Sequence, residues 1–308
     1  MRIAIAGGGG FANILARQLS ETPHATIVLS RRTHPEFENY GCQVIAVDYG
    51  DLESLQFTLR GVDLVISTIS GPEQINLIDA ARRARVGCFV PSEFEGPLSR
   101  RPTDHDPFER DSLTALDFLD RCAASRSRPM RYTVFSCGLF YERYGPGGLA
   151  SLNMGASFGA QRPSTDMLDL AAGIAEYPVT NSHGHQVHVT MTSVYDVASF
   201  VVSAIELGIH NWPREFRMRG AHLTTQRLVE ITQEATGIEL EVFSRPYQQV
   251  HDWLHYHNNM QDATSSRKML HLIQVADGRF AFNDTANLNE LVDVAPVGLL
   301  TWLQSTWA

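Results

Sequence analysis

The sequence predicts an α/β fold, in which a doubly wound parallel sheet is followed by a smaller, irregular C-terminal substrate domain. Three observations support this prediction. Short apolar segments alternate with helical patterns over the first 135 residues, the strand segments are apolar throughout, and the alternation stops beyond about residue 137. Because strands that are apolar on both faces must be covered on both faces, we expect helices on each side of a parallel sheet.

The predicted elements follow one another in a regular order. Strands are expected over residues 2–6, 26–30, 43–47, 63–68, 87–91 and 131–136, and helices over 11–21, 51–60, 73–85 and 109–124. Later helices are expected over 196–208, 224–237 and 247–260, whereas residues 144–163 are rich in glycine and proline and predict a long loop. We therefore divide the chain into a nucleotide-binding domain over 1–140 and a mainly substrate-binding region over 141–308, with some return to the first domain.

Composition and charge exclude several classes of protein. The 308 residues carry a formal net charge of −9 and are 44% hydrophobic, which is typical of a folded protein. Nucleic-acid binding needs a basic face, so we expect no nucleic-acid partner. No apolar run approaches the length of a membrane span, so we expect no membrane partner and a cytoplasmic protein. The four cysteines lack zinc or thioredoxin spacing and are expected to be free and mostly buried.

Four consecutive glycines, Gly7 to Gly10, lie between the first predicted strand and the first predicted helix. A dinucleotide-binding fingerprint requires this context. Gly7 would permit the tight turn, and Gly10 would let a pyrophosphate approach the backbone at the amino end of the helix. Asn13 stands where the third glycine of the fingerprint would be, which predicts looser packing of helix on strand. A flexible turn is the alternative, but the surrounding pattern favours a Rossmann nucleotide site.

Two arginines, Arg31 and Arg32, follow the second predicted strand. NAD-preferring domains usually carry an acid there, which binds the ribose hydroxyls. Two guanidiniums instead match a 2′-phosphate, so the sequence predicts NADPH as the cofactor; a solvated basic turn is the alternative. Asp48, at the end of the third strand, is placed to meet the adenine amino group, and Asp51 is expected to cap the helix over 51–60.

Several stretches resemble the NmrA-like, isoflavone-reductase-like branch of the atypical short-chain dehydrogenases. They include GGGGF, LSRR, QINLIDAARRARVGCFVPSEF, YTVFSCGLFYERY and TSVYDVASFVVSAIE, and P-S-E-F at 91–94 is close to a signature of this branch. The resemblance extends over essentially the whole chain. It implies NADPH-dependent reduction of an aromatic or polycyclic small molecule in secondary metabolism, by a monomer or homodimer. The nicotinamide would lie over the turn of Pro91 and Ser92, and Phe11 and Ser70 complete the expected cofactor contacts.

One departure from the family concerns proton transfer. The family's reductases carry a lysine in the helix after the P-S-E-F turn, where this chain has Asp111 or Ser112. The single lysine, Lys268, is too far along the chain to replace it. Another group must then deliver the proton.

The candidate proton donors are His105, Ser112 and Tyr141. We favour His105, because an unperturbed imidazole titrates near neutral pH. Tyr141 and Tyr144 follow the sixth strand and could reach substrate at the carboxyl edge of the sheet. The alternatives are a hydrogen-bonding role for His105 in its loop and a packing role for the tyrosines.

Two groups of histidines are candidates for metal ligands or pocket-lining residues. Alternation would put His183 and His185 on one face of a strand, and His251 and His255 lie four residues apart on one face of a helix. No carboxylate or thiol completes a zinc-like set, so we predict no metal site. His251, Trp253 and His255 remain candidates for lining a pocket.

Three functions are compatible with these patterns. The favoured one is an NADPH-dependent reductase, because the aromatic residues beyond residue 137 suit an apolar pocket. A regulator of the NmrA type, which senses NADP and binds a protein partner without turnover, is favoured by the missing lysine. A redox-neutral isomerase or cyclase on the same fold is the third. An open, aromatic-lined cavity would indicate catalysis, and a filled one regulation.

Overall fold

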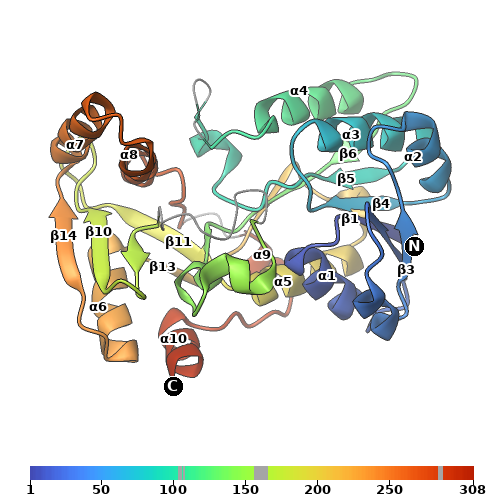
Figure 1. The fold of residues 1–308 in the computed structure, drawn as a ribbon. Coiled ribbons are helices and arrows are strands. Elements are labelled where there is room, and N and C mark those ends of the chain that lie inside the picture. The colour runs from blue at the N-terminus through green and yellow to red at the C-terminus, as the bar shows by residue number, and fades with distance from the viewer. Residues whose placement is uncertain (103–105, 107, 156–165, 284–286) are drawn as a thin grey trace.

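The computed structural model describes residues 1–102, 106, 108–155, 166–283 and 287–308 (Figure 1). Its centre is a six-stranded sheet in the order β3-β2-β1-β4-β5-β6, with every neighbouring pair parallel. The strands are β1 (Arg2–Ala6), β2 (Ala25–Ser30), β3 (Gln43–Ala46), β4 (Leu64–Ser67), β5 (Cys88–Val90) and β6 (Arg131–Tyr132). The order reverses between β1 and β4, so the predicted doubly wound sheet is confirmed.

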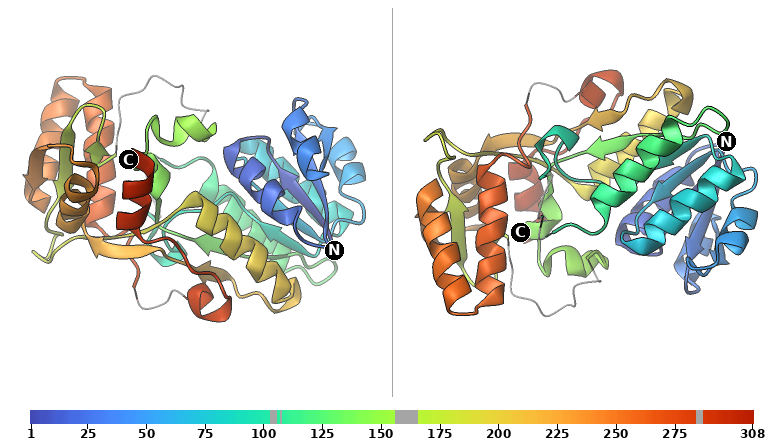
Figure 2. Two further views of the ribbon diagram at one scale, coloured as in Figure 1. Left: turned by 90° about the horizontal axis from the view of Figure 1, so that it is seen from below. Right: turned by 90° about the horizontal axis from the view of Figure 1, so that it is seen from above.

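Helices cover both faces of this sheet (Figures 1 and 2). α1 (Gly10–Leu19) and α5 (Val194–Glu206) pack together on one face, and α2 (Leu52–Thr58), α3 (Pro72–Ala84) and α4 (Ser112–Ala123) cover the other. Successive residues of β1 enter opposite cores, because side chains alternate along a strand: Ile3 and Ile5 on the α1 side, Ala4 and Ala6 on the other. Asp51 caps α2 as expected, accepting from the Ser54 N–H at 3.0 Å.

The C-terminal half is more regular than the sequence predicted. One sheet has the order β14-β10-β9, a second has the order β13-β11-β8, and β12 pairs with β7. These strands are β7 (Val134–Ser136), β8 (Leu139–Phe140), β9 (Leu168–Asp169), β10 (Ile174–Pro178), β11 (His188–Thr192), β12 (Glu215–Arg217), β13 (Ala221–Thr224) and β14 (Glu241–Arg245). The helices are α6 (Thr225–Thr236), α7 (Tyr247–Asn259), α8 (Ala263–Ala276), α9 (Asn287–Leu291) and α10 (Leu299–Trp307).

Two local predictions are corrected by the structure. The single strand expected over 131–136 is divided at Thr133, since β6 completes the large sheet while β7 pairs with β12. The predicted long loop is preceded by a short 3-10 helix, η3 (Tyr141–Tyr144), and contains a second, η4 (Gly148–Leu152); residues 156–163 of the loop lie outside the described residues. The domain boundary near residue 140 stays a prediction, and α5 does return to the first domain.

The expectation that His183 and His185 share a strand face is wrong. Both lie in a turn between Thr180 and Gln186, which form an isolated bridge. The side chain of Asn181 accepts hydrogen bonds from the His183 and His185 N–H groups at 2.9 and 3.0 Å, which holds the turn closed. Across the described ranges, no helix is long and apolar enough to cross a membrane.

Candidate active site

A cleft of about 910 Å³ opens at the carboxyl ends of the central strands. The loops that follow β1, β4 and β5 line it, through residues 7–10, 68–70 and 92–95. The C-terminal half supplies the facing wall, from η3, from residues 149 and 153–155, and from α8. Since β1 and β4 flank the point where the strand order reverses, the cleft occupies the position at which open α/β sheets bind ligands.

The glycine loop is shaped by close approaches of its neighbours. Gly7 has φ +116°, and a Cβ there would overlap the Thr68 hydroxyl. A Cβ on Gly10 would overlap the carbonyl oxygen of Leu152, because the segment 148–155 lies against the loop. The Gly10 N–H donates to the Asn153 carbonyl at 3.3 Å. The glycines are therefore required both by the backbone conformation and by this neighbouring segment.

Most of the residues assigned to the cofactor line the cleft. These are Gly7, Gly10, Phe11, Arg31, Ser70 and Ser92. The Arg31 side chain is 73% exposed, and its contact with Glu73 is 3.9 Å long. A hydrogen bond holds the turn after β5 to α3: the Ser92 N–H donates to the Gln74 side chain at 2.7 Å.

Three other assigned residues do not line the cleft: Arg32, Asp48 and Pro91. Arg32 is exposed to solvent, and Pro91 is buried beneath the turn. The Asp48 carboxylate accepts from the Gly50 N–H at 2.8 Å, which stabilises the turn before α2. The structure therefore brings Arg31, but not Arg32 or Asp48, to the wall of the cleft.

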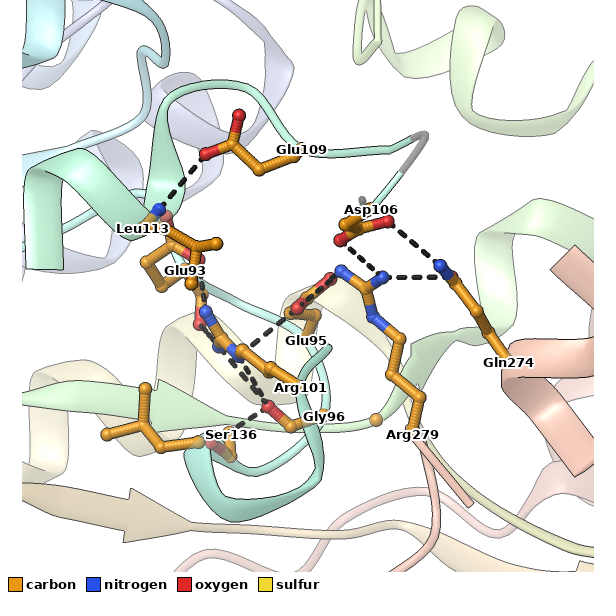
Figure 3. A network of polar contacts seen from close by, with 12 residues as sticks. Glu93, Glu95, Gly96, Arg101, Asp106, Glu109, Leu113, Ser136, Gln274 and Arg279 are labelled. Atoms are coloured by element: carbon orange, nitrogen blue, oxygen red, sulfur yellow. Dashed lines mark hydrogen bonds and ion pairs between the residues drawn. The ribbon is translucent and has the colours of Figure 1, made fainter. Parts of the chain in front are cut away.

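A buried ionic network forms the floor beside the P-S-E-F turn (Figure 3). Glu93 is 4% exposed and pairs with Arg101, which also contacts Glu95 at 3.1 Å. Arg279 donates to both oxygens of Glu95 and to Asp106. The network joins the turn after β5 to the segment that follows α8, so it connects the two walls of the cleft.

The two buried acids of this network respond differently to their surroundings. Burial raises the pKa of Glu93, which the Arg101 guanidinium and the Ser112 hydroxyl only partly oppose. Burial would also raise the pKa of Asp106, but hydrogen bonds from the Phe108 N–H, Gln274 and Arg279 outweigh it and lower this pKa. Asp106 is thus held ionised by its partners.

The candidate proton donors are separated by the structure. Ser112 begins α4 and lines the cleft near Glu93. His105 lies outside the described residues. Tyr141 is fully buried in the C-terminal core, where its hydroxyl donates to the Val297 carbonyl at 3.2 Å and its ring packs on Trp302. Tyr141 does not line the cleft, so its expected role as proton donor is not supported.

The histidine-rich helix α7 also lies away from the cleft. His251, Trp253 and His255 do not line it, and the ring of His251 packs on Tyr247 at 4.8 Å. Within the described ranges, no three His, Cys, Asp or Glu side chains are grouped as metal ligands. All four cysteines are free and buried, as expected, and burial raises the pKa of the Cys137 thiol.

Sequence reasoning missed most of the residues that line the cleft beyond the cofactor loops. They are four phenylalanines, Phe94, Phe108, Phe140 and Phe280, and the charged or titratable groups Arg110, Arg143, Arg267 and His271. The last two belong to α8, which was not predicted. A signal for α8 was present: Asp262 caps it, accepting from the Ser265 N–H at 3.1 Å, and Gly278 follows its end with φ +81°.

Comparison with proteins of known sequence gives related reductases. The model of the NmrA-like family matches residues 1–296. An isoflavone reductase homologue of Nicotiana tabacum is 34% identical over 108 residues, which cover 30% of this chain and 35% of that protein. This chain therefore spans only about a third of the Nicotiana relatives that it matches. A bifunctional pinoresinol-lariciresinol reductase of Linum usitatissimum is 25% identical over 262 residues, 78% of this chain and 76% of that protein.

Solved structures share the fold. The complex of leucoanthocyanidin reductase with NADPH from Vitis vinifera has a TM-score of 0.69 at 15% identity and covers 99% of both chains. The NADPH complex of an NADPH-dependent quinone oxidoreductase from Escherichia coli has a TM-score of 0.69 at 18% identity and covers 99% of this chain and all of that one. Because the family model extends over nearly the whole sequence, the resemblance seen in the motifs is confirmed, and the chain belongs to the NmrA-like family.

Proposed function

We propose that this protein is an NADPH-dependent reductase of an aromatic or polycyclic small molecule. The observation that carries the proposal is the continuity of the cleft. One cavity joins the glycine loop, at the switch point of the sheet, to a group of four phenylalanines, Phe94, Phe108, Phe140 and Phe280, of which Phe280 lies in the C-terminal half. A cofactor at the first end and an aromatic substrate at the second would meet above the P-S-E-F turn. The reductases among the family relatives support the same reaction class.

The residues at the first end suit a dinucleotide. Gly7 and Gly10 leave no side chain between the backbone and the cleft, and α1 begins at Gly10 without a side-chain cap, so its first N–H groups and positive dipole end are suited to a pyrophosphate. In such a complex the Gly10 N–H would have to release the Asn153 carbonyl. Arg31 would bind the 2′-phosphate, because Arg31 lines the cleft and the contact of its guanidinium with Glu73 is long, at 3.9 Å.

The second end suits a flat apolar ring. Phe94 packs edge-on against Phe11 with ring centroids 4.7 Å apart, which places aromatic surface beside the expected nicotinamide position. Phe108 and Phe280 line the same cleft from the other side. Its volume lies in the range of small-molecule sites, and the side chains of the described residues leave it open. An open, aromatic-lined cavity favours an enzyme over a regulator.

NADPH would supply the hydride, and the chain would supply orientation and a proton. The Gln74 contact fixes Ser92, and the pair of Glu93 with Arg101 fixes the next residue of the turn. Ser112 stands near the position of the family lysine and lines the cleft. His105 is our favoured proton donor, because an imidazole can donate a proton near neutral pH.

The alternative is a regulator of the NmrA type that senses NADP without turnover, and the missing lysine at residues 111–112 favours it. Calorimetric titration with NADPH and NADH, followed by NADPH oxidation with aromatic enones, ketones and benzylic ethers, separates the two. Preferential NADPH binding with turnover of at least one acceptor is expected. Tight NADPH binding without any turnover would favour the regulator, while conversion of a substrate without net NADPH consumption would identify an isomerase or cyclase.

A further inference from the structure

Three arginines from distant segments meet in the substrate half of the cleft. Arg110 precedes α4, Arg143 lies in η3, and Arg267 lies in α8. All three line the same cleft. Burial lowers the pKa of Arg110, and repulsion from Arg143 and Arg267 lowers it further, while Glu95 and Glu93 oppose this shift. Like charges repel, so a fold that gathers three guanidiniums in one cavity gains stability when an anion enters it.

The acids nearby are already engaged with guanidiniums. Asp166 pairs with Arg143 at 3.0 Å. Glu93 and Glu95 also act on Arg110, but Glu93 is bound by Arg101 and Glu95 by both Arg101 and Arg279. Among the described residues that line this part of the cleft, four arginines (Arg110, Arg143, Arg267 and Arg279) face three acids (Glu93, Glu95 and Asp166).

A buried imidazole with an unpaired ring nitrogen lies in the same part of the cleft. His271 lines the cleft, is 7% exposed, and its Nε2 atom has no hydrogen-bond partner among the described residues. Burial lowers the pKa of His271 to about 4, and Arg143, Arg279 and Arg267 oppose its protonation. A buried polar atom without a partner is costly, so it marks a place where a ligand can supply one. Arg143 likewise has a buried Nε without a partner in the described chain.

Aromatic rings flank these charged groups. The centroid of the His271 ring lies 5.8 Å from that of Phe108 and 5.7 Å from that of Phe280, and the Arg267 guanidinium lies over the Phe108 ring at 4.7 Å. A planar ligand packed on the phenylalanines would carry its anionic group toward the guanidiniums. Arginine is well suited to this, because its fork binds a carboxylate with two parallel hydrogen bonds.

From this arrangement we infer that the substrate is an aromatic molecule that bears a carboxylate, bound by Arg110, Arg143 and Arg267. The inference deepens the proposed function and rests on it, since it assigns the substrate to the far end of the same cleft. It predicts discrimination between an acid and its ester, because the ester keeps the ring and loses the charge.

The test is a binding measurement that needs no turnover. The wild-type protein, with and without saturating NADPH, is titrated with cinnamate, 2-naphthoate and 3-phenylpropionate, and with the methyl ester of each. At least one acid is expected to bind about 10-fold or more tightly than its ester, the range for hydrogen bonds to a charged group. Arg110→Met and Arg267→Met should each remove this preference. Arg121→Met is the control, because Arg121 is 66% exposed on α4, where it pairs with Asp117 and does not line the cleft.

Two results would overturn the inference: equal binding of acid and ester across all three pairs, or an unchanged preference in both cleft variants. NADPH binding and oxidation, recorded on the same samples, report separately on the proposed function. A carboxylate preference without NADPH oxidation would leave the anion site standing and remove the reductase. NADPH oxidation with neutral acceptors but no carboxylate preference would support the reductase and remove the anion site.

Discussion

Arg279 donates two hydrogen bonds to the carboxylate of Glu95, at 2.9 and 3.0 Å, and so joins the segment after α8 to the turn after β5 (Figure 3). The same guanidinium donates to Asp106 at 2.7 Å and to the Gln274 side chain at 2.8 Å. Arg279 is 6% exposed, so these partners replace the water that its charge has lost. The pair holds the cofactor wall and the substrate wall of the cleft together.

Removing this guanidinium should be strongly destabilising. Arg279→Met leaves Glu95 and Asp106 without their shared partner, and breaking a buried pair costs about 3–5 kcal/mol. Urea denaturation should show a loss of this size, whereas Arg121→Met on the exposed face of α4 should change stability by about 0.5 kcal/mol or less. A loss no larger than that of the control would mean that the network contributes nothing net.

Cofactor preference should depend on Arg31 far more than on Arg32. Arg31→Ala removes a charge-assisted contact to the 2′-phosphate, so NADPH binding should weaken by about 1.5–3 kcal/mol, while NADH binding barely changes. Arg32→Ala is the matched control, because Arg32 is a neighbouring arginine that does not line the cleft. Calorimetric titration of both cofactors measures the difference. Equal losses of affinity for NADPH and NADH in Arg31→Ala would show that Arg31 does not contact a 2′-phosphate.

A side chain at Gly10 should block the cofactor end of the cleft. A Cβ there overlaps the Leu152 carbonyl, so in Gly10→Val either the segment 148–155 or the glycine loop must move. Overpacking of this kind costs about 1–3 kcal/mol, and NADPH binding should weaken by at least as much while the fold survives.

The control for this variant is Gly298→Val, because a Cβ at Gly298 meets nothing within 4 Å. Circular dichroism checks the fold of both variants, and calorimetry measures their affinity for NADPH. Near-native affinity in Gly10→Val would show that the pyrophosphate does not approach this position.

The first half of the fold could be predicted because its signals are local. β1 is apolar on both faces, since it lies between two layers of helices, and a glycine run follows it. In the second half the helices expected over 196–208, 224–237 and 247–260 are confirmed as α5, α6 and α7, but its strands could not be predicted. β8 and β9 have two residues each, too few for any periodicity, and β10 pairs with β14 across a long intervening stretch of chain. Such pairings depend on tertiary context rather than on sequence pattern.

The same distinction holds for the site. The glycine loop and Arg31 follow strands at positions that the fold class fixes, so their place at the cleft could be expected. Arg143 and Arg267 carry no motif and become neighbours only when η3 and α8 pack around the cleft. Tyr141 illustrates the opposite error, because a residue after a strand was expected at the carboxyl edge and is instead buried against Trp302.

The free energy of unfolding should depend on pH because His271 is buried. Its pKa is about 4 in the folded protein against 6.5 for a free imidazole, so between these values the unfolded chain binds more protons and stability rises with pH. Wild type should therefore lose about 3 kcal/mol more than His271→Phe as the pH falls from 6.5 to 4. Denaturation at a series of pH values measures this difference. Parallel curves for the two proteins would show that His271 is not held neutral by its surroundings.

The last prediction concerns the proton that accompanies hydride transfer. Among the described groups that line the cleft, each is poorly suited to deliver it. Glu93 is paired with Arg101, His271 is neutral with a pKa of about 4, and Ser112 offers a hydroxyl far from its pKa at neutral pH. His105 lies outside the described residues, and it is favoured because an imidazole in general titrates near neutral pH, where general acid catalysis is most effective.

His105→Ala should accordingly slow the single-turnover oxidation of NADPH by about 10²-fold or more, with little change in NADPH affinity. Ser112→Ala is the comparison, because Ser112 lines the cleft near the position of the family lysine. Ser112→Lys need not restore a faster rate, since Glu93 and Arg101 already form a closed pair beside it. A rate in His105→Ala equal to that of wild type, together with a large loss in Ser112→Ala, would transfer the role to the serine. The pH dependence supplies a second check: a step that uses an imidazolium as proton donor should slow as the pH rises, because the proton donor is then lost.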